Sequence, residues 1–410
     1  MSTGSGSATV GAGAELTVLA LNSGSSSLKF GLYRVARSRI ETLLSGEAAS
    51  IGDGRSVFRA LDSHRDELVA ETFPIASQRE AIVRIGRLLA DAGVPAPAAI
   101  GHRIVHGGPR HRQPCLIDAT VLRHLEAAAL FAPLHTPPAL AVIRFAQEHF
   151  PGLPQSACFD TAFHAALPDV ARVLPIAKEL RSEGIERYGF HGLSCESIVH
   201  QLADDLPERL VIAHLGNGAS VTAVKAGKSI DTSMGLTPTG GLIMGTRSGD
   251  LDPGVLVYLM RQKKLDADQI EALVDRRSGL LGISGVGSDM RQLHAVGASN
   301  ADARLAIEMF CYAVRKQIAG MIAALDGVDS IVFTGGIGEN DAVARAAICA
   351  GLAWIGVSLD PARNRSASNP VSDAASRCTV QVLGSQEDAQ IARHTRALVQ
   401  GAPLASYSGP

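Results

Sequence analysis

The chain has 410 residues, which is more than one hydrophobic core usually fills, so two domains are the default expectation. Hydrophobic residues make up 46% and charged residues 19%, with 42 glycines, a composition typical of a globular protein that is rich in turns. A net charge of -2 excludes a general attraction to nucleic acid or anionic membranes, and no run of about 18 apolar residues predicts a spanning helix.

The cysteines and the two ends of the chain bear on its location. The six cysteines are scattered without a C-x-x-C pair, so we expect reduced thiols and a cytoplasmic protein. No His/Cys cluster has the spacing of zinc ligands, which argues against structural zinc. Residues 1–14 are small and polar, without the basic and apolar parts of a signal peptide, and are expected to form a flexible extension. Residues 403–410 are expected to form a flexible tail.

The first predicted strand begins at Leu16 and ends in an unusual polar segment, "NSGSSS", before the apolar pattern returns at Leu28. Serine hydroxyls, the backbone of Gly24 and the cation of Lys29 lie within a few residues of one another. Glycine-rich turns let backbone N–H groups converge on an anion without a Cβ in the way. This segment therefore indicates a phosphate-binding turn, although glycine turns are mostly just turns.

Residues 77–93 predict a helix. Ser77 and Glu80 have the spacing of a capping box, and Gly93 follows the last residue of the apolar face formed by Ile82, Ile85 and Leu89. A longer helix is predicted at residues 303–325 from apolar residues at helical spacing.

Two polar motifs follow the first predicted helix. "GHRIVHGG", residues 101–108, contains Arg103, whose planar guanidinium suits a carboxylate or a phosphate; a surface ion pair is the ordinary alternative. "FDTAFH", residues 159–164, contains Asp160, for which the ordinary explanation is a helix N-cap. In "YGFHGLS", His191 is by default a packed and hydrogen-bonded residue.

A second strand-turn-strand segment at residues 210–226, "LVIAHLGNGASVTAVKA", resembles residues 16–32. We interpret the pair as one supersecondary unit used once in each domain, with chance similarity as the alternative. At a constant offset the matched residues are Leu21 with Leu215, Gly24 with Gly218, and Ser26 with Ser220. A weaker third example, residues 330–340, again ends a buried strand in a glycine-rich turn.

Two familiar nucleotide motifs are excluded. "AGKS", residues 226–229, lacks the first glycine of a P-loop and is predicted to be the tip of a hairpin. No G-x-G-x-x-G with a helix behind it predicts a Rossmann site. "MGTRSGDLDPG", residues 244–254, is too polar for a core and too glycine-rich for a helix face, which makes Arg247 a candidate site residue. Arginines, a histidine and a lysine within glycine-rich backbone favour phosphoryl transfer, with acidic groups holding Mg²⁺.

In order, the motifs "LNSGSSSLKF", "GHRIVHGG", "FDTAFH", "YGFHG", "HLGNGAS", "MGTRSGDLDPG", "GSDMR" and "TGGIGEN" resemble the acetate kinase family, from about Leu16 to about Leu398. The resemblance implies the duplicated actin-like, ribonuclease H-like α/β fold of sugar kinases and heat-shock chaperones, with the active site in the cleft between the domains. The implied boundaries are 15–161 for the first domain, completed by a C-terminal helix at 387–402, and 162–386 for the second. It further implies reversible phosphoryl transfer from ATP to acetate, with Mg²⁺ or alternatively Mn²⁺, a homodimer formed through the second domain, and metabolic coupling to a phosphotransacetylase or a similar enzyme.

The same resemblance implies roles for individual residues. Asp160, His191 and Arg247 match catalytic residues, and Asn22 and Glu387 match residues associated with the metal. The residues expected to bind the acceptor are Arg103, Val105, Leu134, Phe190 and Pro238. The residues expected to contact ATP are Lys29, His214, Leu215, Gly216, Asn217, Gly218, Asp289, Met290, Arg291, Gly336, Ile337, Gly338, Glu339 and Asn340.

The chain departs from the family pattern at a few positions. Thr136 stands where asparagine is usual, Cys195 replaces a histidine, and Ser385-Gln386 replaces Thr-Asn. Two alternatives stay open. A propionate or butyrate kinase would share the fold, although Val105 matches the valine that narrows an acetate pocket. A non-catalytic actin-like ATPase is disfavoured by the presence of both Arg103 and Arg247, because such a protein has no carboxylate to hold.

Overall fold

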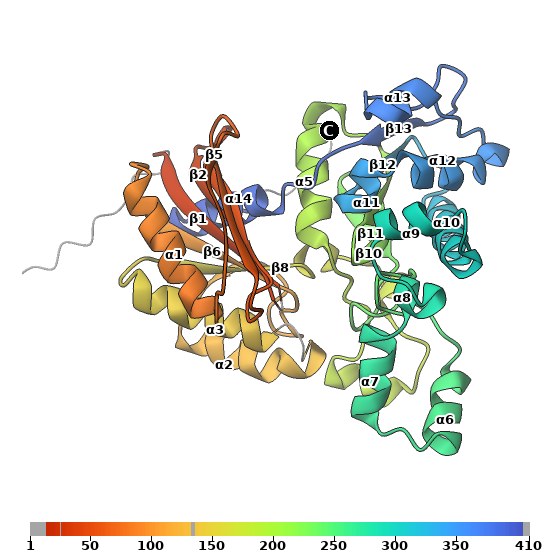
Figure 1. Ribbon diagram of the computed structural model, residues 1–410, viewed down its shortest axis with the longest axis horizontal. Coiled ribbons are helices and arrows are strands. Elements are labelled where there is room, and N and C mark those ends of the chain that lie inside the picture. The colour runs from red at the N-terminus through yellow and green to blue at the C-terminus, as the bar shows by residue number, and fades with distance from the viewer. Residues whose placement is uncertain (1–13, 25, 133–135, 405–410) are drawn as a thin grey trace, which may run out of the picture. The chain divides into compact units, whose positions relative to one another are not determined.

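The computed structural model describes residues 14–24, 26–132 and 136–404. The chain divides into two compact units, shown in Figure 1. The first contains the described residues up to Ala162 and resumes at Gln386, and the second runs from Phe163 to Ser385. Most of the predicted extension (1–14) and tail (403–410) lies outside the described residues.

The first unit is built on an eight-stranded sheet in the order β5-β4-β3-β2-β1-β6-β8-β7. β1 pairs antiparallel with β2 and parallel with β6, and β6 pairs parallel with β8. The strands are β1 (Leu16–Ser23), β2 (Leu28–Val35), β3 (Ile40–Ala49), β4 (Ser56–Asp62), β5 (Glu67–Phe73), β6 (Ala99–Ile104), β7 (Cys115–Leu116) and β8 (Gln155–Phe159).

Helices cover both faces of this sheet. α1 (Gln78–Asp91) and α3 (Thr136–His149) pack on the face that carries Leu19 and Ile100, and α2 (Ala119–Ala127) packs beside α3. The opposite face is covered by α14 (Glu387–Val399), which crosses β1, β6 and β8 (Figure 1). The Ser156 hydroxyl lies 2.7 Å from the hydroxyl of Thr395 on α14. The end of the chain therefore completes the first unit.

The second unit repeats the central part of this arrangement. Its sheet has the order β11-β10-β9-β12-β13, with antiparallel pairs on one side of β9 and parallel pairs on the other, as around β1. The strands are β9 (Arg209–Leu215), β10 (Ala219–Lys225), β11 (Lys228–Thr232), β12 (Ser330–Thr334) and β13 (Thr379–Val382). The duplication predicted from the two strand-turn-strand segments is confirmed by this shared strand order.

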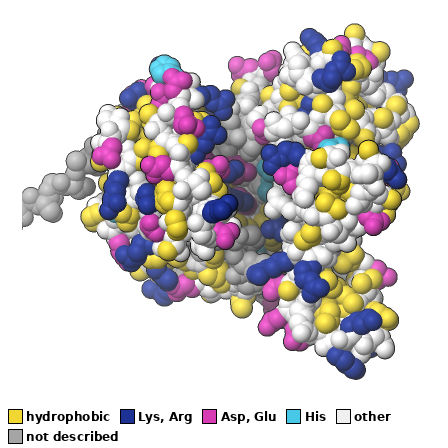
Figure 2. Space-filling model, viewed as in Figure 1, with side chains coloured by type: hydrophobic (Ala, Val, Ile, Leu, Met, Phe, Trp, Pro, Cys, Tyr) yellow, Lys and Arg dark blue, Asp and Glu magenta, His cyan; other side chains and the backbone are white. Residues whose placement is uncertain are grey.

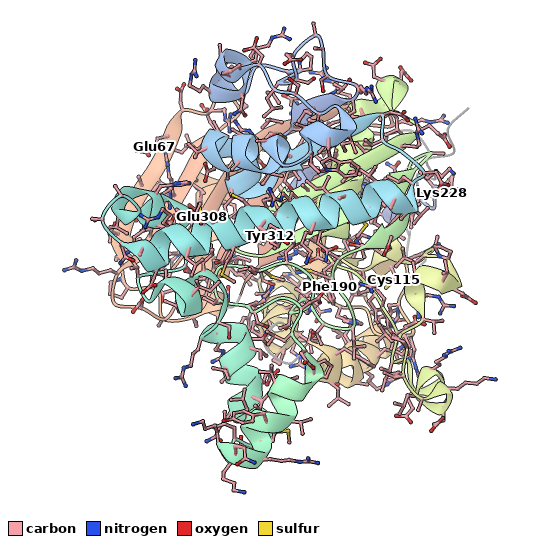
Figure 3. The ribbon with its side chains drawn as sticks, turned by 90° about the vertical axis from the view of Figure 1, so that its right-hand side faces the viewer. Glu67, Cys115, Phe190, Lys228, Glu308 and Tyr312 are labelled. Carbon is pink, nitrogen blue, oxygen red and sulfur yellow. The ribbon has the colours of Figure 1, made fainter. Side chains whose placement is uncertain are left out.

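The helices of the second unit include α10 (Ala301–Ala324), which crosses Figure 3 with Glu308 and Tyr312 on its exposed side. The other helices are α4 (Asp169–Arg172), α5 (Gly192–Leu202), α6 (Pro253–Gln262), α7 (Ala267–Arg276), α8 (Gly279–Ser284), α9 (Met290–Val296), α11 (Gly335–Asn340), α12 (Ala342–Ala350) and α13 (Pro361–Ser366). Short 3₁₀ helices occur at Ala128–Phe131, Ala162–His164, Lys178–Glu183, Ala203–Asp205 and Ala353–Ile355. Within the described part of the chain, every helix is too short or too polar to cross a membrane.

The local predictions held with three corrections. Ser77 caps α1 as expected, but the Glu80 carboxylate accepts the N–H of Ala76 and not that of Ser77. Ser26 does not correspond to Ser220, because Ser26 lies in the β1–β2 turn whereas Ser220 pairs with His214 within the second hairpin. The glycine-rich segment after β12 is not a turn but the short helix α11. The predicted hairpin tip at residues 226–227 is confirmed.

Candidate active site

The neighbouring strands β1, β6 and β8 bring three predicted residues to one edge of the first sheet. Asn22 is the last residue but one of β1, Arg103 is the last but one of β6, and Asp160 directly follows β8. The carboxyl ends of neighbouring parallel strands meet at the same edge, which is where open α/β sheets bind ligands. α14 begins with Glu387 and packs against the same strands.

Arg103 and Asp160 form a buried ion pair. Arg103 Nε lies 3.0 Å from both oxygens of the Asp160 carboxylate, and Nη2 lies 2.5 Å from Oδ2. Asp160 is 1% exposed and the Arg103 side chain is 19% exposed, so the carboxylate is buried and the guanidinium largely so. Neither ordinary explanation applies here: Arg103 is not in a surface pair, and the Asp160 carboxylate receives a guanidinium.

Asn22 extends this pair into a network. Its Oδ1 accepts from Arg103 Nη1 at 3.2 Å, and its Nδ2 donates to Glu387 Oε2 and to Asp388 Oδ1, each at 3.0 Å. Asp388 was missed by the sequence interpretation. Its signal was the second acidic residue of "SQEDAQIA", but consecutive acids in the first turn of a helix are ordinary.

Burial and neighbouring charges shift the pKa values of the groups in this network. Burial raises the pKa of Asp388 to about 6, with the Asn22 hydrogen bond opposing the rise and the charge of Glu387 adding to it. Burial also raises the pKa of Asp160, although Arg103 opposes the rise. Burial disfavours the charged form of Arg103, but Asp160 and Glu387 together raise its pKa. The network holds more carboxylates than guanidinium groups.

This composition fits a divalent cation. Mg²⁺ is usually bound by one or two carboxylates together with waters and phosphate oxygens. Glu387 and Asp388 supply carboxylates beside the amide of Asn22, and their charge exceeds what Arg103 neutralises after pairing with Asp160. Among the described residues no three His, Cys, Asp or Glu side chains form a complete metal cage, which a Mg²⁺ shared with phosphates does not need.

The other predicted residues of the first unit surround this network. Lys29 lies opposite Asn22 in the β1–β2 pair and is exposed, and its charge opposes the rise that burial causes in the pKa of Asp388. Val105 directly follows β6 and is 8% exposed. Leu134 lies outside the described residues.

In the second unit the corresponding strand ends carry glycine backbone. β9 ends at Leu215 and is followed by Gly216, Asn217 and Gly218, while the neighbouring β12 is followed by Gly335 and Gly336. A Cβ added to Gly216 would lie 3.8 Å from the backbone nitrogen of Gly336, so the two predicted ATP segments meet. Gly335 has φ 77°, and a Cβ there would lie 2.7 Å from the carbonyl oxygen of Leu215.

His191 and Arg247 converge on the same glycine turn. A Cβ added to Gly218 would lie 3.1 Å from His191 Nε2 and 3.5 Å from Arg247 Nη1. His191 has φ 58°, an uncommon left-handed conformation, and its Nδ1 lies 2.9 Å from Ser220 Oγ. Its ring stacks on His214 with the centroids 4.1 Å apart. The structure therefore brings together His191, Arg247 and the predicted ATP turn.

The remaining predicted residues of the second unit fall into two groups. Pro238 lies beside Arg247, whose Nη1 donates to its carbonyl oxygen at 3.3 Å, and Phe190 is buried just before His191. Asp289 caps α9 and binds the exposed guanidinium of Arg291, whose hydrogen bonds lower the pKa of Asp289. No described contact joins this second group to the His191 cluster.

Within α11, the Glu339 carboxylate accepts backbone N–H groups, and its expected contact with ATP stays a prediction. Its Oε1 accepts the N–H of Gly335 at 2.9 Å and that of Ser385 at 3.0 Å. The carboxylate thus holds the start of α11 and the segment that leads to Gln386. Asn340 Nδ2 donates to the carbonyl of Gly336 at 2.9 Å. Met290 and Gly338 are buried, and Ile337 is half-buried.

Two of the departures from the family pattern, Cys195 and Ser385, lie near the His191 cluster. Cys195 is fully buried, with Sγ 3.7 Å from Thr222 Oγ1 behind the His191 cluster. The Ser385 hydroxyl lies 3.0 Å from Ser194 Oγ, which in turn bonds His214 Nδ1 at 2.8 Å. Thr136 is buried at the start of α3. The expectation that both clusters meet in one cleft stays a prediction.

Comparisons with known proteins agree with these motifs. The model of the acetokinase family matches residues 17–393. The acetate kinase of Methylocella silvestris is 41% identical over 399 residues, covering 93% of this chain and 98% of that protein. The acetate kinase of a Synechococcus species is 40% identical over 405 residues, with coverage of 94% and 100%.

Solved structures give the same result. A propionate kinase from Francisella tularensis superposes with a TM-score of 0.87 at 37% identity, covering 93% of this chain and all of that chain. The acetate kinase of Porphyromonas gingivalis superposes with a TM-score of 0.82 at 34% identity, covering 94% of this chain and all of that chain. The two-domain actin-like fold is thereby shown, and the chain belongs to the acetokinase family of kinases.

Proposed function

We propose that the protein transfers the γ-phosphoryl group of ATP to acetate, giving acetyl phosphate and ADP in a reversible, direct in-line reaction. The observation that carries this proposal is the buried Arg103–Asp160 pair, linked through Asn22 to Glu387 and Asp388. Phosphoryl transfer depends on positioning and electrostatic stabilisation, and this network supplies fixed charges for both.

In the first unit, Asp160 fixes the guanidinium of Arg103. An arginine has five N–H groups, and the hydrogen bonds to Asp160 and Asn22 use Nε and one N–H on each terminal nitrogen. The second N–H on each terminal nitrogen is placed to bind a carboxylate or phosphoryl oxygen. Arg103 would hold the acceptor in this way, with Val105 lining the pocket for its methyl group.

In the second unit, His191 Nε2 and Arg247 would donate to the transferring phosphoryl group. Ser220 holds the opposite nitrogen of the His191 ring, and Pro238 receives one N–H of Arg247, so both side chains are oriented before substrate arrives. The backbone at Gly216–Gly218 and Gly335–Gly336 would approach the phosphates of ATP, because glycine removes the side chain that would block them.

Glu387 and Asp388 would hold Mg²⁺, directly or through waters, with Asn22 orienting both carboxylates and with Mn²⁺ as an alternative. When bound, the cation neutralises charge on the phosphate oxygens. Nδ2 of Asn22 donates a hydrogen bond to each carboxylate, so the two carboxylates are held side by side.

Acetate is proposed over longer acids because Val105 matches the valine that narrows the acceptor pocket in the family. The likeness to a propionate kinase makes propionate the second candidate acceptor. One methylene in a hydrophobic pocket changes the free energy of discrimination by only about 1–3 kcal/mol. Overlapping activity toward propionate is therefore expected.

The test is a steady-state comparison of acetate, propionate and butyrate as acceptors, with Mg·ATP and hydroxylamine to trap the acyl phosphate. The highest kcat/KM for acetate is expected. A preference for propionate would keep the reaction and change the substrate. If ATP binds but no acid yields hydroxamate, the phosphotransferase proposal fails in favour of a non-catalytic ATPase.

We also propose a homodimer formed through α6 and α7. Neither helix contains a buried residue, and on α6 Val255, Val257, Tyr258 and Met260 are 43–56% exposed. Hydrophobic side chains are visible on this lobe at the lower right of Figure 2. Apolar patches of this kind usually mark interfaces. Light scattering of the wild type should give twice the mass of the chain. The double variant V257D/Y258D should give the mass of one chain, whereas the control K178D, on an exposed 3₁₀ helix, should stay a dimer. A monomeric wild type would overturn the proposed dimer.

A cytoplasmic location fits the six cysteines, none of which forms a disulfide and which, apart from half-buried Cys115, are buried. The product acetyl phosphate is a reactive acyl donor, so an acyltransferase of the phosphotransacetylase type is the proposed metabolic partner.

A further inference from the structure

Arg345, on α12, is among the largest side chains that the second unit buries completely. It is 1% exposed, and all three of its guanidinium nitrogens make hydrogen bonds. Nη1 donates to the carbonyl oxygens of Gly338 and Glu339 at 2.9 and 3.0 Å. Nε donates to Asn364 Oδ1 at 2.9 Å, and Nη2 donates to the Asn364 carbonyl at 2.6 Å. The guanidinium of Arg345 thus joins α11 to α13 through hydrogen bonds.

The acceptors are all neutral. Among the described residues no carboxylate lies within ion-pair distance of Arg345, and burial lowers its pKa while the more distant Asp341 opposes that effect. Burying a charge without an opposite charge is costly, so a simple packing role would be met better by an apolar side chain. What arginine adds is a rigid plane of donors with fixed directions.

The carbonyl groups bound by the guanidinium belong to the C-terminal end of α11. Gly338 and Glu339 lie in the last turn of α11, where carbonyl groups lack partners within the helix. The first residue of α11 is Gly335, whose N–H is held by the Glu339 carboxylate. Asn364 is itself fixed, since its Nδ2 donates to the carbonyl of Ala342 at 2.8 Å. α11 is therefore clamped at both ends, and Figure 1 shows α11, α12 and α13 as neighbours.

We propose that Arg345 is a positioning residue for ATP, which holds the α11 backbone in the geometry that binds the nucleotide without contacting the nucleotide itself. The inference rests on the proposed assignment of Gly335–Asn340 to ATP. Asn364 contributes to this positioning, because it binds the guanidinium of Arg345 and orients it toward α11.

The consequence is selective. A loosened α11 should weaken the binding of ATP and leave the binding of acetate unaffected, because no described contact of Arg345 leads to the Arg103 network. The conservative variant R345K keeps the charge, but a lysine cannot reach both Asn364 and the α11 carbonyls with fixed geometry. N364A removes the acceptor of Nε and leaves the guanidinium in place. R365K, on an exposed neighbour of Asn364 in α13, is the matched control.

Two readouts separate positioning from general stability. The first is the rise in Tm caused by Mg·ATP, which reports nucleotide binding without turnover. The second is the pair of KM values for ATP and acetate, measured well below each Tm. For R345K we expect a KM for ATP raised about tenfold, an acetate KM within about twofold of wild type, and a reduced ATP-induced shift. N364A should change in the same direction by a smaller factor, and R365K should match wild type.

A lower Tm with an unchanged ATP-induced shift and unchanged KM values would assign Arg345 a structural role only. Equal rises in both KM values, or an effect on kcat alone, would also overturn the inference. If wild type binds ATP but forms no acyl phosphate, the proposed reaction fails while the Tm readout still decides the role of Arg345. If wild type shows no ATP-induced shift, the assignment of α11 to ATP and this inference fall together.

Discussion

The two units share the topology of the central part of their sheets and use its strand ends in opposite ways. In the first, the ends of β1, β6 and β8 carry Asn22, Arg103 and Asp160, and the start of α14 adds carboxylates. In the second, the ends of β9 and β12 carry glycines, whose backbone has no side chain in front of it. The same fold therefore provides fixed side-chain charge in one copy and close backbone approach in the other.

The difference follows from what each edge holds in place. Charged side chains need partners when they are buried, and the first unit supplies them within the network of Arg103, Asp160 and Asn22. Backbone donors need only that no side chain stands in front of them, which glycine provides at the cost of conformational freedom. Changes to the side chains of the first unit should thus act on acceptor and metal, and changes to the glycine backbone of the second should act on the nucleotide.

The largest expected effect is on the ion pair of the first unit. Asp160→Leu removes the carboxylate that binds the largely buried guanidinium of Arg103, so we expect kcat/KM to fall about 1000-fold or more, with a stability loss of about 2–3 kcal/mol because Arg103 is partly exposed and keeps its bond to Asn22. The double variant R103M/D160L should regain most of that stability in urea unfolding and remain inactive. Activity within tenfold of wild type in the single variant would remove Asp160 from the reaction.

Arg247→Ala tests the charged group of the second unit. We expect kcat to fall about 100- to 1000-fold, because a donor to the transferring group is lost, while the Tm shift caused by Mg·ATP is retained. R181A, at an exposed position of the same unit, serves as control. Normal turnover of Arg247→Ala would show that this side chain is not at the site.

Each unit also buries a neutral histidine, which predicts a shared sensitivity to acid. Burial lowers the pKa of His102 and of His164 to about 4, from about 6.5 in the unfolded chain. The unfolded chain binds more protons below pH 6.5, so stability is present above that pH and falls as the pH approaches 4. Each histidine accounts for up to about 3 kcal/mol.

The measurement is urea unfolding at pH 7.5 and pH 5. H102L should reduce the loss of stability at the lower pH, since leucine does not titrate, and H64L, at an exposed histidine of the first unit, should not. A pH dependence that H102L leaves unchanged would contradict the assignment.

The smallest effect distinguishes two adjacent glycines in the second unit. Gly335→Ala should destabilise the fold by about 1–2 kcal/mol, because φ is 77° and the new Cβ would meet the Leu215 carbonyl at 2.7 Å. Gly336→Ala should leave Tm unchanged, since no atom lies within 4 Å of its added Cβ, yet reduce the ATP-induced shift if phosphate approaches there. Equal behaviour of the two variants would argue against α11 as the nucleotide segment.

Local elements and most site residues were predictable because their signals lie within a few residues. The apolar period of residues 303–325 appears as α10, and Ser77 caps α1. The repeated strand-turn-strand segments predicted the duplication, although the offset failed at Ser26, since the two turns differ in length and a hairpin register depends on the turn.

The family, the duplicated fold and the residue types of the candidate site were readable from the chain alone, because motifs of a few residues carry that information. Only the tertiary structure decided their partners: Asp160 binds Arg103 and does not cap a helix, Asp388 joins Glu387 on Asn22, and Glu339 turns inward to Gly335. These contacts join residues up to 366 positions apart. Which distant groups meet depends on how strands and helices pack, and no local pattern encodes that distance.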